Sequence, residues 1–268
     1  LARLSDKNAQ REYYLTDIIA HAVAEGVAVN AAHPEATEET LGVNSKAQLA
    51  QLERLYQKRQ VDALLERGAT VADPARIDVR GQLSIGSDVF IDVNCVFEGR
   101  VVLGDRVRIG PNNVLRDVTV GEDTEVLGFC YLEDATIGAR ARIGPFARMR
   151  PSATLADDVH IGNFVEVKNS TMGAASKANH LAYVGDATVG RRVNIGAGTI
   201  IANYDGVNKH RTNIGDDVQT GSNSVLVAPI EIGDGATIGA GSTISKNAPP
   251  GKLTVARAKQ LTVDGWKR

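Results

Sequence analysis

The spacing of apolar residues changes near residue 80 and divides the chain into two parts. From Ile85 onward, large apolar residues recur every six positions, and occasional hexads that are one residue short do not break the pattern. Glycine often follows the apolar position, as in IGSD, LGDR, IGPN and IGDG. A chance series of alternating strands would not keep one register for so long. The repeat therefore predicts a parallel β-helix, a mainly β fold in which each hexad forms a short strand and a corner.

Three hexads complete one triangular coil, so residues about 18 apart should stack in columns at the roughly 4.8 Å spacing of paired strands. The register pauses once, between Ile201 and Ile214, where the segment NYDGVNKHRT is polar apart from Val207. We expect a loop that leaves the coil within a single hexad. Two hexads plus one residue are the alternative.

The part of the chain before residue 80 predicts two helices. In LTDIIAHAVAEG the apolar residues follow the i, i+3, i+4, i+7 spacing of one helix face, with Thr16 as the N-cap and Gly26 at the end. A second helix is expected from Ser45 to Gly68, and Ser45 and Gln48 have the spacing of a capping box. At 1.5 Å per residue this helix would be roughly 35 Å long, enough to join two bodies.

Composition narrows the classes of function. Only 4% of the residues are aromatic whereas 27 are glycine, which favours short aliphatic strands joined by many turns. The formal net charge of −2 gives no basic surface, so we expect no nucleic-acid partner. The two cysteines, Cys95 and Cys130, suit a reducing cytosol. No apolar stretch of about 18 residues predicts a membrane span. The first residue, Leu1, indicates a fragment of a longer protein.

The columns bring charged residues together on one face. Arg150 and Lys168 each follow an apolar position, one coil apart, so both should point outward, one above the other. Stacked like charges are unfavourable unless an anion lies against them. The pair is therefore either a solvated surface feature or a clamp for a phosphate group. Tyr183 and Asn194 also point outward and would suit sugar hydroxyls.

His180 stands at the head of another column. If the loop occupies one hexad, Ala197, Ser222 and Ala240 follow it at the same offset, over roughly 15 Å. These small residues either reflect the usual composition of β-helix corners or form a track for an extended pantetheine arm, with its thioester beside His180. A neutral imidazole can take the proton from an amine that attacks a thioester. Glu166 is a candidate to orient that imidazole.

Several segments resemble a known family. FARMRPSATL, GNFVEVKNS, SKANHLAYVGDATVG, NIGAGTIIANYDGVNKHRT and APPGKLTVAR are similar to the acyltransferase half of bacterial bifunctional N-acetylglucosamine-1-phosphate uridyltransferase/glucosamine-1-phosphate N-acetyltransferase. Upstream, NAQREYYLTDII and GVNSKAQL resemble the end of its uridyltransferase half. The resemblance implies a left-handed β-helix, a cytoplasmic homotrimer with active sites between subunits, and acetyl transfer from acetyl-CoA to glucosamine-1-phosphate. The product would feed the synthesis of UDP-N-acetylglucosamine for peptidoglycan and lipopolysaccharide.

Position by position, the resemblance implies roles for individual residues. His180 matches the catalytic base. The residues that match sugar-phosphate contacts are Arg150, Lys168, Tyr183 and Asn194. The residues that match acetyl-CoA contacts are Ala197, Asn203, Tyr204, Ser222, Ala240 and Arg257. Three of the acetyl-CoA residues are the small side chains of the His180 column, so the two lines of reasoning agree.

The resemblance also implies three domains. Residues 1–46 match the end of the uridyltransferase domain as a small α/β remnant, residues 47–67 form a linker helix, and residues 68–268 form the β-helix acetyltransferase domain. The glycine-rich nucleotide loop and an aspartate ligand of magnesium are not in the sequence, and Asn44 alone matches the second magnesium ligand. Mg²⁺ is therefore expected only for the uridyltransferase half, whose site is incomplete here. Arg11 stands where the family usually has glycine.

Three rival functions differ in what they require. A zinc-dependent carbonic anhydrase on the same scaffold needs three converging histidines, but His160, His180 and His210 share no column. The histidines other than His180 are interpreted as structural or solvated: His21, His33, His160 and His210. A non-catalytic solenoid would favour a flat, monotonous outer face. Another acyltransferase with a different amine acceptor remains open on spacing alone.

Overall fold

The computed structural model describes residues 1–267 and divides the chain into two compact units, Leu1–Leu52 and Glu53–Arg268. The first unit contains helix α1 (Asp17–Ala24) and a 3₁₀ turn, η1 (Thr37–Thr40), joined by segments without regular structure. The first predicted helix is confirmed, and Gly26 follows its end with a φ of 71°. Thr16 occupies the N-cap position with helical dihedral angles, and its side chain makes no capping hydrogen bond. No residue of α1 is buried, so its apolar face is exposed.

Helix α2 (Lys46–Glu66) confirms the second predicted helix. The Ser45 hydroxyl accepts a hydrogen bond from the Gln48 backbone at 3.2 Å, as a capping box requires. The reciprocal bond goes from the Asn44 backbone N–H to the Gln48 side chain at 2.7 Å, one residue earlier than the motif predicts. The C-terminal half of α2 buries Val61 and Leu64 in the core of the β-helix. No helix within residues 1–267 is long and apolar enough to cross a membrane.

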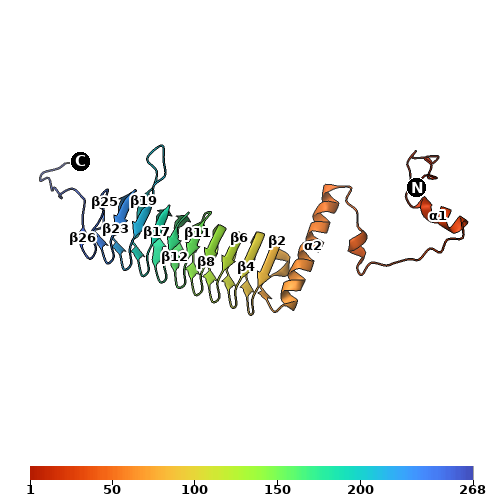
Figure 1. Cartoon of the computed structure of the whole chain (residues 1–268), viewed down its shortest axis with the longest axis horizontal. Helices are drawn as coiled ribbons and strands as arrows, with labels where there is room; N and C mark the ends of the chain where they lie inside the picture. Colours follow the sequence, from red (N-terminus) through yellow and green to blue (C-terminus); the bar gives the residue numbers. More distant parts are fainter. Residues whose placement is uncertain (268) are drawn as a thin grey trace. The chain divides into compact units, whose positions relative to one another are not determined.

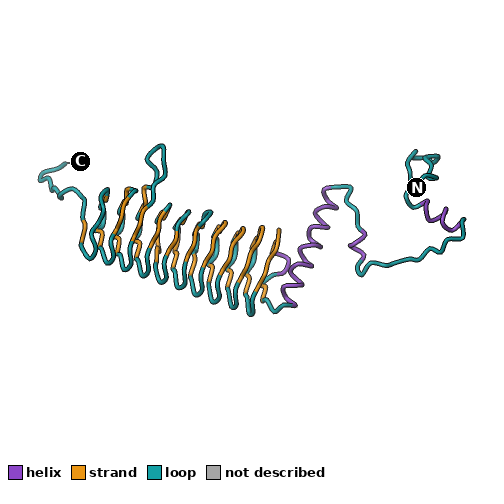
Figure 2. Tube along the Cα trace, viewed as in Figure 1, coloured by secondary structure: helices purple, strands orange, loops and turns teal. Residues whose placement is uncertain are grey.

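Between α2 and Thr254, short parallel strands stack into a regular solenoid (Figures 1 and 2). The first face is one 11-stranded sheet. Its strands are β1 (Thr70–Val71), β3 (Phe90–Ile91), β5 (Arg108–Ile109), β7 (Glu125–Val126), β9 (Arg142–Ile143), β12 (His160–Asn163), β15 (Lys177–His180), β18 (Asn194–Ile195), β21 (Gln219–Thr220), β24 (Thr237–Ile238) and β26 (Leu253–Thr254).

The second and third faces begin as shared strands and then separate. The long strands β2 (Ile77–Ile85), β4 (Cys95–Leu103), β6 (Val114–Val120) and β8 (Tyr131–Ile137) run around the corner between the two faces. Beyond β8 the second face contains β10 (Arg148–Met149), β13 (Glu166–Lys168), β16 (Tyr183–Gly185), β19 (Ile200–Ala202), β22 (Val225–Val227) and β25 (Thr243–Ile244). The third face contains β11 (Ala153–Leu155), β14 (Thr171–Met172), β17 (Ala187–Val189), β20 (Thr212–Ile214) and β23 (Ile230–Ile232).

The apolar residues of the hexads form three columns inside this prism. The backbone register aligns Ile91 with Ile109 on the first face and Phe97 with Leu115 on the second, 18 residues apart in each case. All four are at most 1% exposed. The six-residue repeat therefore forms the predicted parallel β-helix. This parallel solenoid is consistent with the left-handed β-helix that the family resemblance implies.

The predicted loop leaves the coil within a single hexad. Strand β19 belongs to the second face and pairs with β22, whereas β20 belongs to the third face and pairs with β17. Residues 203–211 between them are therefore extruded at one corner, and Figure 1 shows the loop rising beside β19. An antiparallel bridge between Tyr204 and Lys209 closes the loop. The alternative of two hexads plus one residue is wrong.

Candidate active site

His180 is the last residue of β15 and lies exposed at the corner after the first face. Backbone hydrogen bonds join the corner at His180 to the same corner of the following coils. Gly198 N–H donates to the His180 carbonyl at 3.3 Å, and Asn223 N–H donates to the Ala197 carbonyl at 2.7 Å. The same pattern continues from Gly241 to Ser222 at 2.8 Å. The predicted column of His180, Ala197, Ser222 and Ala240 is therefore present in the fold.

The column beyond His180 is lined by small side chains that remain accessible. Ala197 is half-buried, whereas Ser222 and Ala240 are exposed. Arg257, from the segment after the last strand, donates from Nη1 to the Ala240 carbonyl at 2.8 Å and so ends beside the column. The structure thus brings four of the six predicted acetyl-CoA residues to one edge of the prism.

The imidazole of His180 contacts an amide and no carboxylate. Its Nδ1 lies 2.8 Å from Oδ1 of Asn163, which occupies the same position on the preceding coil. Glu166 lies on the second face, where it accepts a hydrogen bond from Arg150 Nη1 at 2.9 Å. Within one chain Glu166 does not contact His180, because a corner of the prism separates the two side chains, and a role for Glu166 in orienting the imidazole stays a prediction.

An open cavity of about 350 Å³ lies beside His180 on the first face. Its lining residues are Leu127, Arg142, Gly144, Pro145, His160, Gly162, Asn163, Asn179 and His180. The Oδ1 atom of Asn179 is buried there without a hydrogen-bond partner. Burial, together with the positive charges of Arg142 and Lys177, lowers the pKa of His160. His160, interpreted from the sequence as structural or solvated, is the first residue of β12 and lines this cavity.

Sequence reasoning missed Asn163, although the signal was available. The prediction considered the column of His180 only on later coils, where the small residues lie. One coil earlier, the same offset from the buried Ile161 leads to Asn163.

Arg150 and Lys168 stack on the second face as predicted, since Met149 and Val167 before them are in register. Each cation has its own carboxylate partner. Arg150 pairs with Glu166 at 2.9 Å, and Lys168 Nζ lies 3.4 Å from Asp186 Oδ2. The carboxylates of Glu166 and Asp186 therefore compensate the two stacked positive charges. Phosphate binding by Arg150 and Lys168 stays a prediction.

Asp186 links the Lys168 stack to the base of the extruded loop. Its side chain is 6% exposed and accepts hydrogen bonds from Lys168, from Asn169 Nδ2 at 2.5 Å and from Asn203 Nδ2. Burial raises the pKa of Asp186, but these hydrogen bonds and the Lys168 charge outweigh it, so the pKa is below the usual value. Asp186 therefore connects Asn203, predicted to contact acetyl-CoA, with Lys168, predicted to contact the sugar phosphate.

Of the other two predicted sugar-phosphate residues, Tyr183 shares a face with Arg150 and Lys168, whereas Asn194 does not. Tyr183 lies on the same second face, in register with Glu166, and its ring covers Gly185 so closely that a Cβ there would collide with it. Asn194 lies on the first face, in register with Lys177. Tyr204, one of the residues predicted to contact acetyl-CoA, is exposed on the extruded loop, and its hydroxyl donates a hydrogen bond to the Gly206 carbonyl at 2.6 Å.

The residues present do not fit a magnesium ion. Asn44 is exposed and lies two residues before the start of α2. Across residues 1–267, no group of three or more His, Cys, Asp or Glu side chains is arranged to hold a metal. A single amide lacks the carboxylate oxygens that Mg²⁺ prefers.

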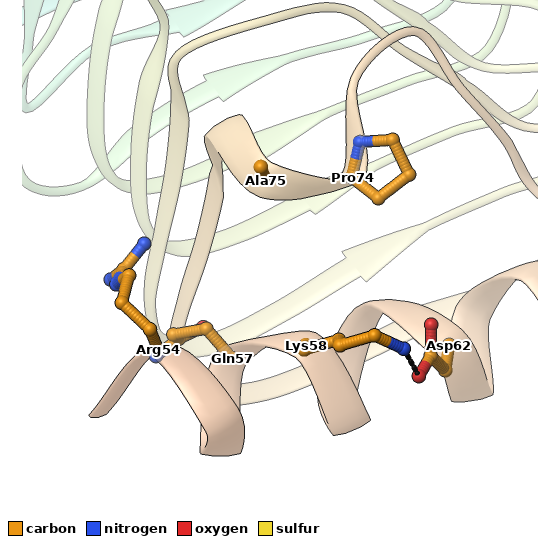
Figure 3. A pocket seen from close by; sticks show the side chains of 6 residues that line it. All are labelled: Arg54, Gln57, Lys58, Asp62, Pro74 and Ala75. Atoms are coloured by element: carbon orange, nitrogen blue, oxygen red, sulfur yellow. Dashed lines mark hydrogen bonds and ion pairs between the residues drawn. The ribbon is translucent and has the colours of Figure 1, made fainter. Parts of the chain in front are cut away.

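A second cavity, of about 260 Å³, lies at the first coil between α2 and a 3₁₀ turn, η2 (Pro74–Arg76) (Figure 3). The lining cations already have partners, because Lys58 pairs with Asp62 at 2.5 Å and Arg54 with Asp78 at 2.7 Å. It contains no candidate base or nucleophile comparable to His180.

Comparisons with known proteins agree with this architecture. Residues 79–172 match the GMPPB C-terminal domain family, and residues 211–246 match the family of bacterial transferase hexapeptide repeats. The solved structure of Arabidopsis UDP-N-acetylglucosamine acyltransferase is 17% identical, with 68% of each chain covered and a TM-score of 0.36, too low to support any further comparison.

Curated relatives match the whole chain. The "Bifunctional protein GlmU" of Ralstonia pickettii is 63% identical over 268 residues, which are 100% of this chain and 59% of that protein. The protein of the same name from Methylibium petroleiphilum is 64% identical over the same residues, or 58% of its length. The recognition made from the sequence is confirmed: the chain belongs to the family of these bifunctional proteins and corresponds to their C-terminal part.

Proposed function

We propose that this chain transfers the acetyl group of acetyl-CoA to the amine of glucosamine-1-phosphate, giving N-acetylglucosamine-1-phosphate. The observation that carries the proposal is the column that begins at His180 and continues through small, accessible side chains. Membership of a bifunctional family whose repeats are those of bacterial transferases supports the same reaction. In a longer protein that also carried a complete uridyltransferase domain, the product would feed cytoplasmic synthesis of UDP-N-acetylglucosamine.

The proposed acetyl transfer uses the residues at the corner that contains His180. The pantetheine arm would lie along Ala197, Ser222 and Ala240, which have no side chain large enough to block it, and would bring the thioester to His180. The acceptor amine attacks the thioester carbonyl, so a C–N bond forms and the C–S bond breaks. His180 accepts the proton from the nitrogen and can return it to the leaving thiolate. A positioned base of this kind contributes roughly 10²- to 10⁴-fold to the rate.

Recognition of the sugar phosphate would need more than one face of the prism. The cations Arg150 and Lys168 lie on the second face, and Asn194 and His180 belong to the first. A convex prism holds these groups apart, whereas a cleft between two prisms could bring the second face of one to the first face of another. The arrangement therefore favours a site shared between copies of the chain.

An aromatic ladder beside the His180 column supports assembly of this kind. Phe129, Phe146 and Phe164 stack along the corner with ring centroids 5.1 and 5.3 Å apart, and each ring is about half exposed. Leu181 follows on the next coil and is 60% exposed. Bulky residues rarely adopt the positive φ that all four have, 51–64°. An exposed apolar strip in strained backbone is typical of an interface, and we propose that it contacts a neighbouring chain in a homotrimer with closed three-fold symmetry.

The test of the function is release of free thiol from acetyl-CoA in the presence of a panel of amino sugars. Glucosamine-1-phosphate should give the highest kcat/KM, with glucosamine-6-phosphate and glucosamine as acceptors that lack the anomeric phosphate. A preference for another amine would establish the alternative, a hexapeptide-repeat acyltransferase with a different acceptor. No release with any amine would overturn the proposal.

A further inference from the structure

The contact between Asn163 and His180 concerns the ring nitrogen that carries the proton in the neutral imidazole, and the inference drawn from it rests on the function proposed above. The two residues are in register on neighbouring coils, and Asn163 Oδ1 lies 2.8 Å from His180 Nδ1. Both side chains also line the cavity of about 350 Å³ on the first face. The amide is therefore held in place by the same rungs that place the histidine.

An amide oxygen can only accept a hydrogen bond, so a ring nitrogen in contact with it must carry the proton. If Nδ1 is the donor, the neutral imidazole leaves its lone pair on Nε2. The opposite arrangement, with the Asn163 amide group donating to Nδ1, would place the proton on Nε2 and remove the base. The orientation of one side-chain amide thus decides whether His180 can act.

We propose that Asn163 is a positioning residue that holds His180 in the tautomer protonated at Nδ1, so that Nε2 is free to accept the proton of the acceptor amine. Asn163 transfers no proton itself. Its side chain carries no charge, which distinguishes it from the carboxylate that often pairs with a catalytic histidine. A carboxylate at this position would stabilise the imidazolium and keep the base protonated to higher pH.

The titratable neighbours of the imidazole come from its own strand and from the preceding rungs of the first face. Lys177 lies on the same strand, His160 on β12 and Arg142 on β9, where Glu125 of β7 lies 3.6 Å from Arg142. Lys177 and Arg142 are cations, whereas the pKa of His160 is lowered. The Asn163 amide adds a hydrogen-bond acceptor beside the imidazole without adding a negative charge.

Two substitutions and one matched control test the proposal. Asn163→Asp keeps the acceptor and adds a charge, so the acid limb of the kcat/KM profile should move up by about one pH unit or more. Asn163→Ala removes the acceptor and should lower kcat at least about tenfold, because the unproductive tautomer becomes accessible. Asn112→Asp is the control, since Asn112 Oδ1 accepts a hydrogen bond from Asn94 Nδ2 at 2.9 Å on another corner rung with no histidine. It should leave the profile unchanged.

A measurement independent of turnover separates this inference from the proposed function. The ¹⁵N chemical shifts of the His180 ring, assigned by comparison with His180→Ala, report which nitrogen is protonated in the full chain. Protonation at Nδ1 in the parent chain, lost in Asn163→Ala, supports the proposal even if no amino sugar is acetylated. Protonation at Nε2 in the parent chain, or an unshifted pH profile in an active Asn163→Asp variant, overturns it.

Discussion

The side-chain amide of Gln57 pairs with the backbone of Val79 as a neighbouring strand would. Val79 N–H donates to Gln57 Oε1 at 2.7 Å, and Gln57 Nε2 donates to the Val79 carbonyl at 3.1 Å. Val79 lies on β2, which has a strand on one side only. Helix α2 therefore covers the open edge of the first coil, which would otherwise present unpaired backbone groups.

Replacing this amide should loosen the first coil. Gln57→Ala leaves the buried N–H and C=O of Val79 without partners, which costs about 1–3 kcal/mol. We expect faster hydrogen exchange at the Val79 amide. Gln51→Ala, an exposed substitution on the same helix, should leave that exchange unchanged, and equal effects from the two variants would contradict a capping role.

Asp186→Asn should weaken the base of the extruded loop. The pKa of Asp186 is lowered in the fold, so its carboxylate stabilises the folded chain above about pH 4, and this contribution is lost as the pH falls further. The variant should be less stable than the parent at pH 7, and the difference should shrink on acidification. Unfolding curves at pH 7 and pH 3 measure it.

The control for Asp186 is Asp217→Asn. Asp217 also has a lowered pKa, caused by Arg192, but both side chains of that pair are 52% exposed. Exposed ion pairs contribute little, so this variant should differ from the parent by much less. A loss of stability as large as that of Asp186→Asn would argue against a special role for the buried carboxylate.

His180→Ala should reduce acetyl transfer by at least roughly 10²-fold with the fold intact, because the proton of the attacking amine loses its acceptor. The side chain is exposed and its backbone carbonyl keeps its bond to Gly198. Circular dichroism checks the fold, and thiol release measures the rate. Near-normal turnover would remove His180 from the mechanism.

Mixed assemblies should recover activity if sites are shared between chains. His180 lies at the corner after the first face, whereas Asn203 lies at the corner after the second. Refolding His180→Ala chains with Asn203→Ala chains should restore part of the activity that neither variant has alone. Lack of recovery in a confirmed trimer would place both residues in one subunit's site, and a fully active monomer in light scattering would exclude shared sites.

We expect no uridylyl transfer from UTP by this chain at any magnesium concentration. Within residues 1–267 no group of three or more His, Cys, Asp or Glu side chains is arranged to hold a metal, and the amide of Asn44 alone does not supply the charge that usually holds this ion. The assay is formation of UDP-N-acetylglucosamine from UTP and N-acetylglucosamine-1-phosphate by the pure chain. A measurable rate would show that the interpretation of residues 1–46 as an incomplete site is wrong.

The spacing of residues along the chain was enough to predict which of them stack on one another. In a solenoid with three hexads per coil, position in space follows directly from separation along the chain, so the column of His180, Ala197, Ser222 and Ala240 could be derived by counting. The pairing of Arg150 above Lys168 followed in the same way, and so did the extrusion of residues 203–211 within one hexad.

The contacts between side chains could not be predicted from that spacing and became known from the folded chain. Glu166 was a candidate to orient His180, but within the chain it contacts Arg150, and Asn163 lies beside the imidazole. Asp186 joins Lys168 to Asn203, which belong to different hexads. Counting specifies the rung and the face of a residue. The direction of a side chain near a corner depends on backbone angles and on the neighbours that compete for its hydrogen bonds, and these exist only in the folded coil.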